Sequence, residues 1–135
     1  MFDGHCAYCG RKIDYKDMQV DHVKPLYRGW KEAPNKGEDV PENLFPSCRR
    51  CNFRKSTLTI EQFRAELKRQ CAGIMERSFQ VKQSLDYGLL EYHDIPIVFY
   101  FEKRQLADIA ANQKDIPPEF KKLVNENFWE LASTE

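Results

Sequence analysis

Two pairs of cysteines have the spacing of metal ligands. Cys6 and Cys9 form one C-x-x-C pair, and Cys48 and Cys51 form the other, with 38 residues between the pairs. Two thiols at this spacing can reach one ion from a tight turn, and two such pairs supply the four sulfur atoms of a tetrahedral zinc site. We therefore expect these cysteines to hold one structural Zn²⁺ ion.

Disulfide bonds are the alternative for these four residues, because paired cysteines in secreted proteins are often oxidised. The sequence begins without a charged and then apolar leader, and its cysteines number five, which is odd. Both observations favour a metal site in a reducing, cytoplasmic setting. The fifth cysteine, Cys71, falls on the apolar side of a predicted helix, where we expect a small buried side chain.

Length and charge limit the classes of protein that remain. The chain has 135 residues, of which 41% are hydrophobic, and this suits a single domain. No run approaches the roughly 18 apolar residues that span a membrane. Residues 1–70 carry a formal charge of +4 and residues 71–135 a charge of −4. This asymmetry indicates a basic functional face beside an acidic remainder, although a chance distribution is the alternative.

Short extended segments and a long loop lie between the cysteine pairs. Residues 18–23 alternate in polarity and predict a strand, in which neighbouring Asp21 and His22 point to opposite faces unless the strand is distorted. Residues 26–41 predict a loop that is a candidate for substrate contact. We expect Trp30 in this loop to lie on the core rather than to stack on a ligand. Residues 42–47 predict a second extended segment, and residues 52–56 a helical start.

The motif around these elements resembles that of the HNH endonuclease family. Its parts are the segments 21–26 (DHVKPL), 42–44 (ENL) and 48–56 (CRRCNFRKS), and they agree in order, spacing and residue type. The resemblance covers about residues 5–57. It implies a ββα-metal fold, in which a hairpin and a helix grip a catalytic divalent cation. We therefore predict an α+β fold with a zinc-braced core over residues 1–58, followed by a mainly helical extension over residues 59–135 that contains a short buried strand.

The residues of the motif supply what phosphodiester hydrolysis requires. The reaction needs an activated water, a counter-charge and a stabilised leaving oxygen. Histidine has an ordinary pKa of about 6.5, so we predict His22 as the general base. Asp21 and Asn52 offer the oxygen donors that Mg²⁺ or Mn²⁺ prefers, and we predict them as ligands of the catalytic cation. The resemblance implies the same roles, and it implies that Asn43 fixes the loop that orients the histidine. Many family members have histidine where this chain has Asn52.

Each of these residues also has a structural alternative. His22 alone would more often be a core histidine, and Asp21 alone a turn or surface residue. Asn52 is of a type that caps helices. His5 precedes a cysteine and could ligate a metal, but four cysteines already complete the zinc shell, so we expect it to be exposed. The joint pattern is what favours the catalytic interpretation.

Basic side chains near the second cysteine pair are candidates for contact with nucleic-acid phosphates. They are Arg49, Arg50, Arg54, Lys55, Lys24 and Arg28. Lys55 is the strongest candidate, because the family motif has a lysine at this position. A solvated surface is the alternative for the whole set.

The extension begins with clear helix signals. Thr59 and Gln62 predict a capping box, and apolar residues continue at helical spacing to about Arg77. We expect this apolar stripe to pack in the core; its residues are Ile60, Phe63, Leu67, Cys71, Ile74 and Met75. Residues 95–101 predict the buried strand, and further helices are predicted around Leu106 and after Pro118. This half should complete the core; a surface for a protein partner or a homodimer is the alternative.

Two functional hypotheses follow. The first is a metal-dependent endonuclease that cuts DNA and, as the resemblance implies, leaves 5′-phosphate and 3′-hydroxyl ends. The second is a zinc-stabilised module that binds nucleic acid or protein, with vestigial catalytic residues. The set of Asp21, His22 and Asn52 separates them, since a binding module does not need it.

Overall fold

A two-stranded hairpin followed by a helix forms the first half of the protein. The computed structural model describes residues 2–33 and 36–111. Strand β1 (Gln19–His22) pairs antiparallel with β2 (Leu44–Ser47), so that Gln19 lies opposite Ser47 and His22 opposite Leu44. Short 3₁₀ turns, η1 (Tyr15–Asp17) and η2 (Pro41–Asn43), precede the two strands, and α1 (Arg49–Lys55) follows β2 almost at once. This ββα unit confirms the predicted α+β class.

The first cysteine pair lies in a turn that is attached to β2. His5 and Lys12 form an isolated bridge on either side of this turn, and Ala7 N donates a hydrogen bond to Pro46 O at 2.9 Å. Proline has no N–H to donate to a sheet, so only its carbonyl is used here. The contact brings the first cysteine pair next to the segment that carries the second pair.

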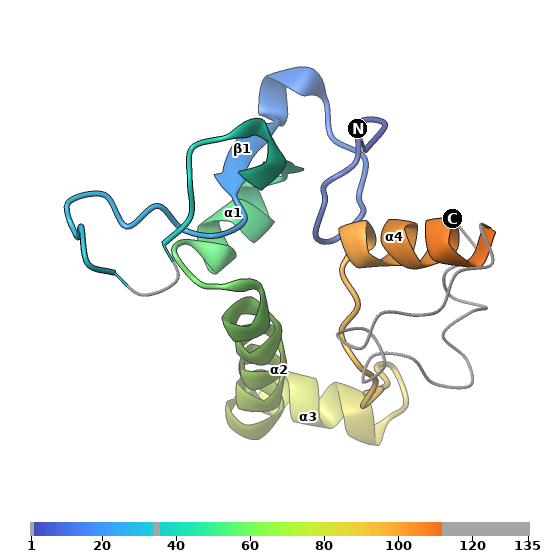
Figure 1. Ribbon diagram of the computed structural model, residues 1–135. Coiled ribbons are helices and arrows are strands. Elements are labelled where there is room, and N and C mark those ends of the chain that lie inside the picture. Colours follow the sequence, from blue (N-terminus) through green and yellow to red (C-terminus); the bar gives the residue numbers. More distant parts are fainter. Residues whose placement is uncertain (1, 34–35, 112–135) are drawn as a thin grey trace.

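Three helices and the segments that join them follow in the described chain (Figure 1). They are α2 (Ile60–Arg77), α3 (Phe79–Asp86) and α4 (Tyr100–Ala111). The predicted capping box is confirmed: Gln62 N donates to Thr59 Oγ1 at 3.2 Å, and Thr59 N donates to Gln62 Oε1 at 3.0 Å. Ser78 ends α2 and caps α3, because its hydroxyl accepts from Val81 N.

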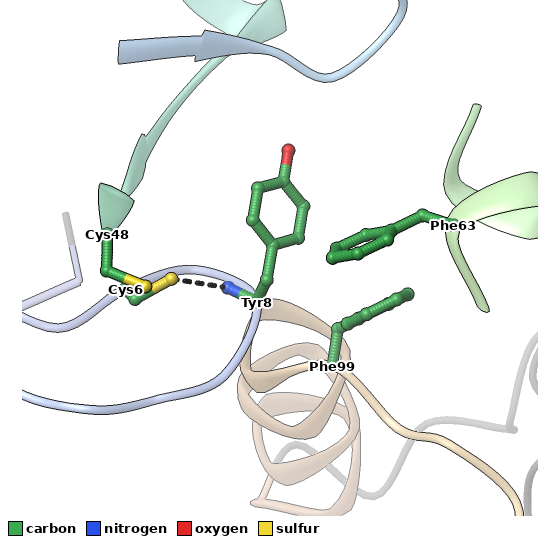
Figure 2. Close-up of a cluster of buried hydrophobic side chains, with 5 residues drawn as sticks. All are labelled: Cys6, Tyr8, Cys48, Phe63 and Phe99. Atoms are coloured by element: carbon green, nitrogen blue, oxygen red, sulfur yellow. Dashed lines mark hydrogen bonds between the residues drawn. The ribbon is translucent and has the colours of Figure 1, made fainter. Parts of the chain in front are cut away.

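An aromatic cluster joins the ββα unit to the helices. Tyr8 lies among Cys6 and Cys48 on one side and Phe63 and Phe99 on the other, and all five are at most 4% exposed (Figure 2). The Tyr8 ring meets Phe63 and Phe99 edge to face at 5.6 and 5.7 Å, and Phe63 stacks on Phe99 at 5.2 Å. Such pairs each add about 0.5–1.5 kcal/mol beyond the burial of area.

The predicted strand at residues 95–101 is wrong. Residues 91–99 have no regular secondary structure, and α4 begins at Tyr100. The first N–H groups of a helix have no partner inside it, and here Tyr100 N and Phe101 N donate to the carbonyls of Tyr8 and Ala7 at 2.9 and 2.8 Å. Glu102 Oε1 also accepts from Phe99 N at 3.0 Å, as the acidic residue of a capping box does.

The apolar stripe of α2 is buried over only part of its length. Phe63 is 1% exposed, whereas Ile74 is 49% exposed and Cys71 is exposed as well. The predictions of burial for Cys71 and Ile74 are therefore wrong, because the far end of α2 extends beyond the aromatic cluster. Trp30 is also exposed, at 55%, and does not lie on the core. The helix predicted after Pro118 lies outside the described residues.

Candidate functional site

The four cysteines of the two C-x-x-C pairs converge. Their sulfur atoms all lie within 4.8 Å of one another, and Cys9 Sγ is 3.8 Å from Cys48 Sγ. Zn–S bonds of about 2.3 Å in a tetrahedron place sulfurs about 3.8 Å apart, so the donor set fits a zinc ion. Among the residues that the structure describes, no other group of three or more Cys, His, Asp or Glu ligands converges in this way.

Hydrogen bonds among these sulfurs lower the pKa of one cysteine and raise that of another. A hydrogen bond from the Cys51 thiol, more than any other contact, lowers the pKa of Cys6 to about 4. The same bond, together with burial, raises the pKa of Cys51. Tyr8 N also donates to Cys6 Sγ at 3.4 Å, the backbone contact that favours a thiolate. These contacts favour the thiolate form of Cys6, which is the form that binds a metal.

Asp21 on β1 is buried in an ion pair with Lys55 on α1. Lys55 Nζ lies 3.0 Å from Asp21 Oδ2, with the two side chains 0% and 7% exposed. The Tyr8 hydroxyl, which points away from Phe99 in Figure 2, donates to the same oxygen. Burial and the neighbouring carboxylate raise the pKa of the Tyr8 phenol far above its usual value, so it stays a donor. The structure therefore contradicts the prediction that Lys55 contacts phosphate, because its ammonium is sealed inside the fold.

His22 follows Asp21 on β1 and faces a loop residue instead. Its Nε2 lies 2.9 Å from Asp39 Oδ1, and its side chain is 25% exposed. This hydrogen bond lowers the pKa of Asp39, so the carboxyl is ionised at neutral pH. Lys55 Nζ donates to the backbone carbonyl of His22 at 3.1 Å and holds that end of the strand.

Asn43 joins the two ends of the loop between the strands. Its Oδ1 accepts from Lys24 N at 2.8 Å, and its Nδ2 donates to the carbonyls of Lys24 and Glu38 at 3.0 and 2.9 Å. Val23 N donates to the Asn43 carbonyl at 3.0 Å. Because Glu38 precedes Asp39, these bonds hold the backbone next to the partner of His22.

Asn52 lies in the second turn of α1 and does not cap a helix. The cap of α1 is Cys48, and that of α2 is Thr59, so the capping alternative for Asn52 is wrong. Its Nδ2 donates to Gln19 Oε1 on β1. The amide nitrogen is thereby engaged, and the amide oxygen is the atom that suits a cation.

Asp21, His22 and Asn52 line one surface pocket of about 560 Å³. Its walls include Arg28, Trp30 and Ser56. Asp21 and His22 both line it from β1, although Asp21 contacts the buried Tyr8 and His22 contacts the exposed Asp39. An acid, a histidine and an amide therefore share one cavity.

The remaining basic candidates lie at the surface. Lys24, Arg28, Arg49 and Arg50 are exposed. Arg54 is about half exposed and lies 4.0 Å from Glu66. His5, expected to be exposed, is instead partly buried, with Nδ1 3.1 Å from Phe2 O.

Three residues of the site were missed by the sequence analysis. Tyr8 holds Asp21, Gln19 holds Asn52, and Asp39 holds His22. Tyr8 had a usable signal, because an aromatic residue between two metal-binding cysteines must lie near the core. Gln19 and Asp39 had no such signal, since their partners lie 33 and 17 residues away.

Comparison with protein families agrees with this geometry. The model of the HNH endonuclease family matches residues 6–58, which contain all four cysteines and the hairpin and helix. Residues 6–58 thus match an HNH endonuclease family domain, with the four-cysteine cluster typical of a zinc-braced HNH motif. Members of this family are generally nucleases, which implies a nucleic-acid substrate. No curated protein matches the chain. No helix in the described part of the chain has the length and apolar character to cross a membrane.

Proposed function

We propose that this protein is a metal-dependent endonuclease that hydrolyses DNA phosphodiester bonds and leaves 5′-phosphate and 3′-hydroxyl ends. The observation that carries the proposal is the pocket shared by Asp21, His22 and Asn52 within an HNH family domain. The four cysteines would bind a structural Zn²⁺ ion that braces this pocket. A module that only binds nucleic acid has no need of a histidine beside an acid and an amide.

His22 acts as the general base in this proposal. Its Nε2–H donates to Asp39, which leaves Nδ1 with the lone pair that takes a proton from the attacking water. The ionised Asp39 then stabilises the imidazolium that forms. Asp39 is thus a positioning residue, and Asn43 keeps the adjacent backbone in place.

Asp21 and Asn52 would hold the catalytic Mg²⁺ or Mn²⁺. When bound, such a cation neutralises charge on the phosphate and on the departing 3′ oxygen. The Tyr8 hydroxyl and the Lys55 ammonium both contact Oδ2 of the Asp21 carboxylate, so Oδ1 would be the ligand atom. Lys55 already offsets the charge of Asp21. With so few protein ligands, water and substrate oxygens would complete the shell, as is usual for Mg²⁺. Arg28, at the rim of the pocket, and the exposed Lys24 are placed to contact phosphate.

A plasmid-nicking assay of His22→Ala tests the proposal. The wild type should nick supercoiled plasmid in the presence of Mg²⁺ or Mn²⁺, and the variant should lose about 10²–10⁴-fold in rate, the usual contribution of a general base. Zinc content and the melting temperature should not change. His93→Ala is the matched control, because His93 is exposed and lies outside the pocket.

Two results would contradict the proposal. Nicking by His22→Ala at the wild-type rate would exclude His22 as the base. A wild type that binds DNA but cuts none with either cation would leave the binding module as the function.

A further inference from the structure

A second pocket, of about 590 Å³, lies between the first cysteine turn and the start of α1. Five cationic side chains line it, and they are Arg11, Lys12, Lys16, Arg49 and Arg50. The first three come from the segment after the first cysteine pair, which the sequence analysis did not connect with nucleic acid. We call this the basic pocket.

The cations of the basic pocket lack the neutralising partners found elsewhere in the molecule. Two carboxylates, Asp14 and Asp17, also line the pocket, which leaves an excess of positive charge. Within the described residues, none of the five cations lies within 4.0 Å of a carboxylate oxygen. In the helical part, by contrast, four cations each have an acidic partner, and they are Arg64, Lys68, Arg69 and Arg104. Repulsion among gathered cations is relieved by a polyanion.

The basic pocket adjoins the candidate catalytic pocket. Gln19 lines the first and accepts a hydrogen bond from Asn52, which lines the second. Arg49, which lines the basic pocket, and Asn52 are three residues apart, so they share one side of α1. These two residues lie about one helical turn apart, which is about 5.4 Å along the helix axis. Duplex DNA carries one charge per about 1.7 Å of its axis, so a duplex cut in one pocket also places phosphates at the other.

We infer that the basic pocket binds the DNA backbone that flanks the cleaved bond. This inference rests on the proposed function for the class of its ligand. It assigns to Arg11, Lys12 and Lys16, together with Arg49 and Arg50, the phosphate contacts that the buried Lys55 cannot make. The turn of the first cysteine pair thereby serves as part of the DNA-binding surface as well as the metal site.

The test is a binding titration with the double variant Lys12→Gln/Lys16→Gln. A fluorescent 20-base-pair duplex is titrated at several NaCl concentrations, with Ca²⁺ in place of Mg²⁺ to prevent cleavage, and anisotropy is recorded. We expect binding at least several-fold weaker than that of the wild type, and a slope of log K against log salt that is smaller by about two, one for each lost phosphate contact. Zinc content and melting temperature should stay unchanged, because both side chains are exposed.

The control removes the same charge from another surface. Lys68→Gln/Lys82→Gln changes two exposed lysines on α2 and α3 and should leave binding close to that of the wild type. Equal losses in both double variants, or wild-type binding and salt slope in the pocket variant, would overturn the inference. Tighter binding of the pocket to a labelled poly-glutamate peptide than to DNA would also overturn it, in favour of an acidic protein partner. Nicking is measured separately, so a wild type that binds DNA through this pocket without cutting it would contradict the proposed activity alone.

Discussion

Lys55 has a different role from the one that its place in the motif suggests. Its ammonium is fully buried, lies 3.0 Å from the Asp21 carboxylate, and donates to the His22 carbonyl. A buried ion pair gains little over an apolar pair of the same shape, but loss of one partner leaves the other charge uncompensated. Lys55 therefore matters because it neutralises and positions two neighbouring residues of the candidate site.

We predict that Lys55→Met lowers the free energy of unfolding by about 3–5 kcal/mol, because Asp21 then stays buried without its cation. Urea denaturation followed by circular dichroism measures the loss. The double variant Asp21→Asn/Lys55→Met should recover much of it, while Lys24→Met, at an exposed lysine, should change little. A Lys55→Met protein that is as stable as the wild type but binds DNA more weakly would restore the phosphate-contact interpretation.

The loop between β1 and β2 depends on a close approach of two backbone segments. Gly37 N donates to Pro25 O at 2.9 Å, and a Cβ atom at Gly37 would lie 2.2 Å from Lys24 O and 2.8 Å from Asn43 Nδ2. Backbone atoms cannot move aside as a flexible side chain can. A glycine is therefore required where Asn43 ties the loop to the strand that carries His22.

Gly37→Ala should consequently separate these segments. We expect a loss of about 1–3 kcal/mol in stability, the usual cost of overpacking. We also expect slower nicking, because the loop carries Asp39, the partner of His22. Chemical denaturation and the plasmid assay report the two effects, with Lys36→Ala at the exposed neighbour as the control. Unchanged stability and rate would show that the loop does not hold His22.

The secondary structure was predictable wherever its signals are local. Thr59 and Gln62 are close in sequence and cap one helix, so the start of α2 could be predicted from residue types alone. Residues 95–101 offered no such signal, because a short β-branched and aromatic run suits a buried strand or a helix start equally. Contacts with the distant Ala7 and Tyr8 decide that α4 begins at Tyr100.

The site shows the same division. The four cysteines and the candidate residues of the pocket were predicted from spacing and family resemblance, because the ligands of a metal and the groups of a motif recur in fixed order. Their partners could not be found in this way. Whether Lys55 faces phosphate or Asp21 depends on how α1 packs on β1, and that packing is a tertiary property that the motif does not encode.

The cysteine cluster and the aromatic core form one structural unit. Cys6 and Cys48 belong to the same buried cluster as Tyr8, Phe63 and Phe99, so the candidate metal site contacts both the ββα unit and the helices. Tyr8 also reaches Asp21 at the candidate site. Loss of a bound ion should therefore destabilise α2 and α4 as well as the hairpin.

We predict that Cys48→Ser removes the bound zinc and abolishes cooperative thermal unfolding of the whole protein. The free energy of binding a structural zinc, about 10–16 kcal/mol, is as large as the stability of a typical domain, about 5–15 kcal/mol. Elemental analysis should find one zinc per wild-type chain and none in the variant. Circular dichroism should show that the helical signal from α2 and α4 is lost together with the near-ultraviolet signal from the aromatic core.

Cys71→Ser is the matched control, because Cys71 is exposed and outside the cluster, and it should keep both zinc and melting temperature. A Cys48→Ser protein that melts like the wild type, or a wild type purified without chelators that contains no zinc, would show that the aromatic core holds the fold without a metal.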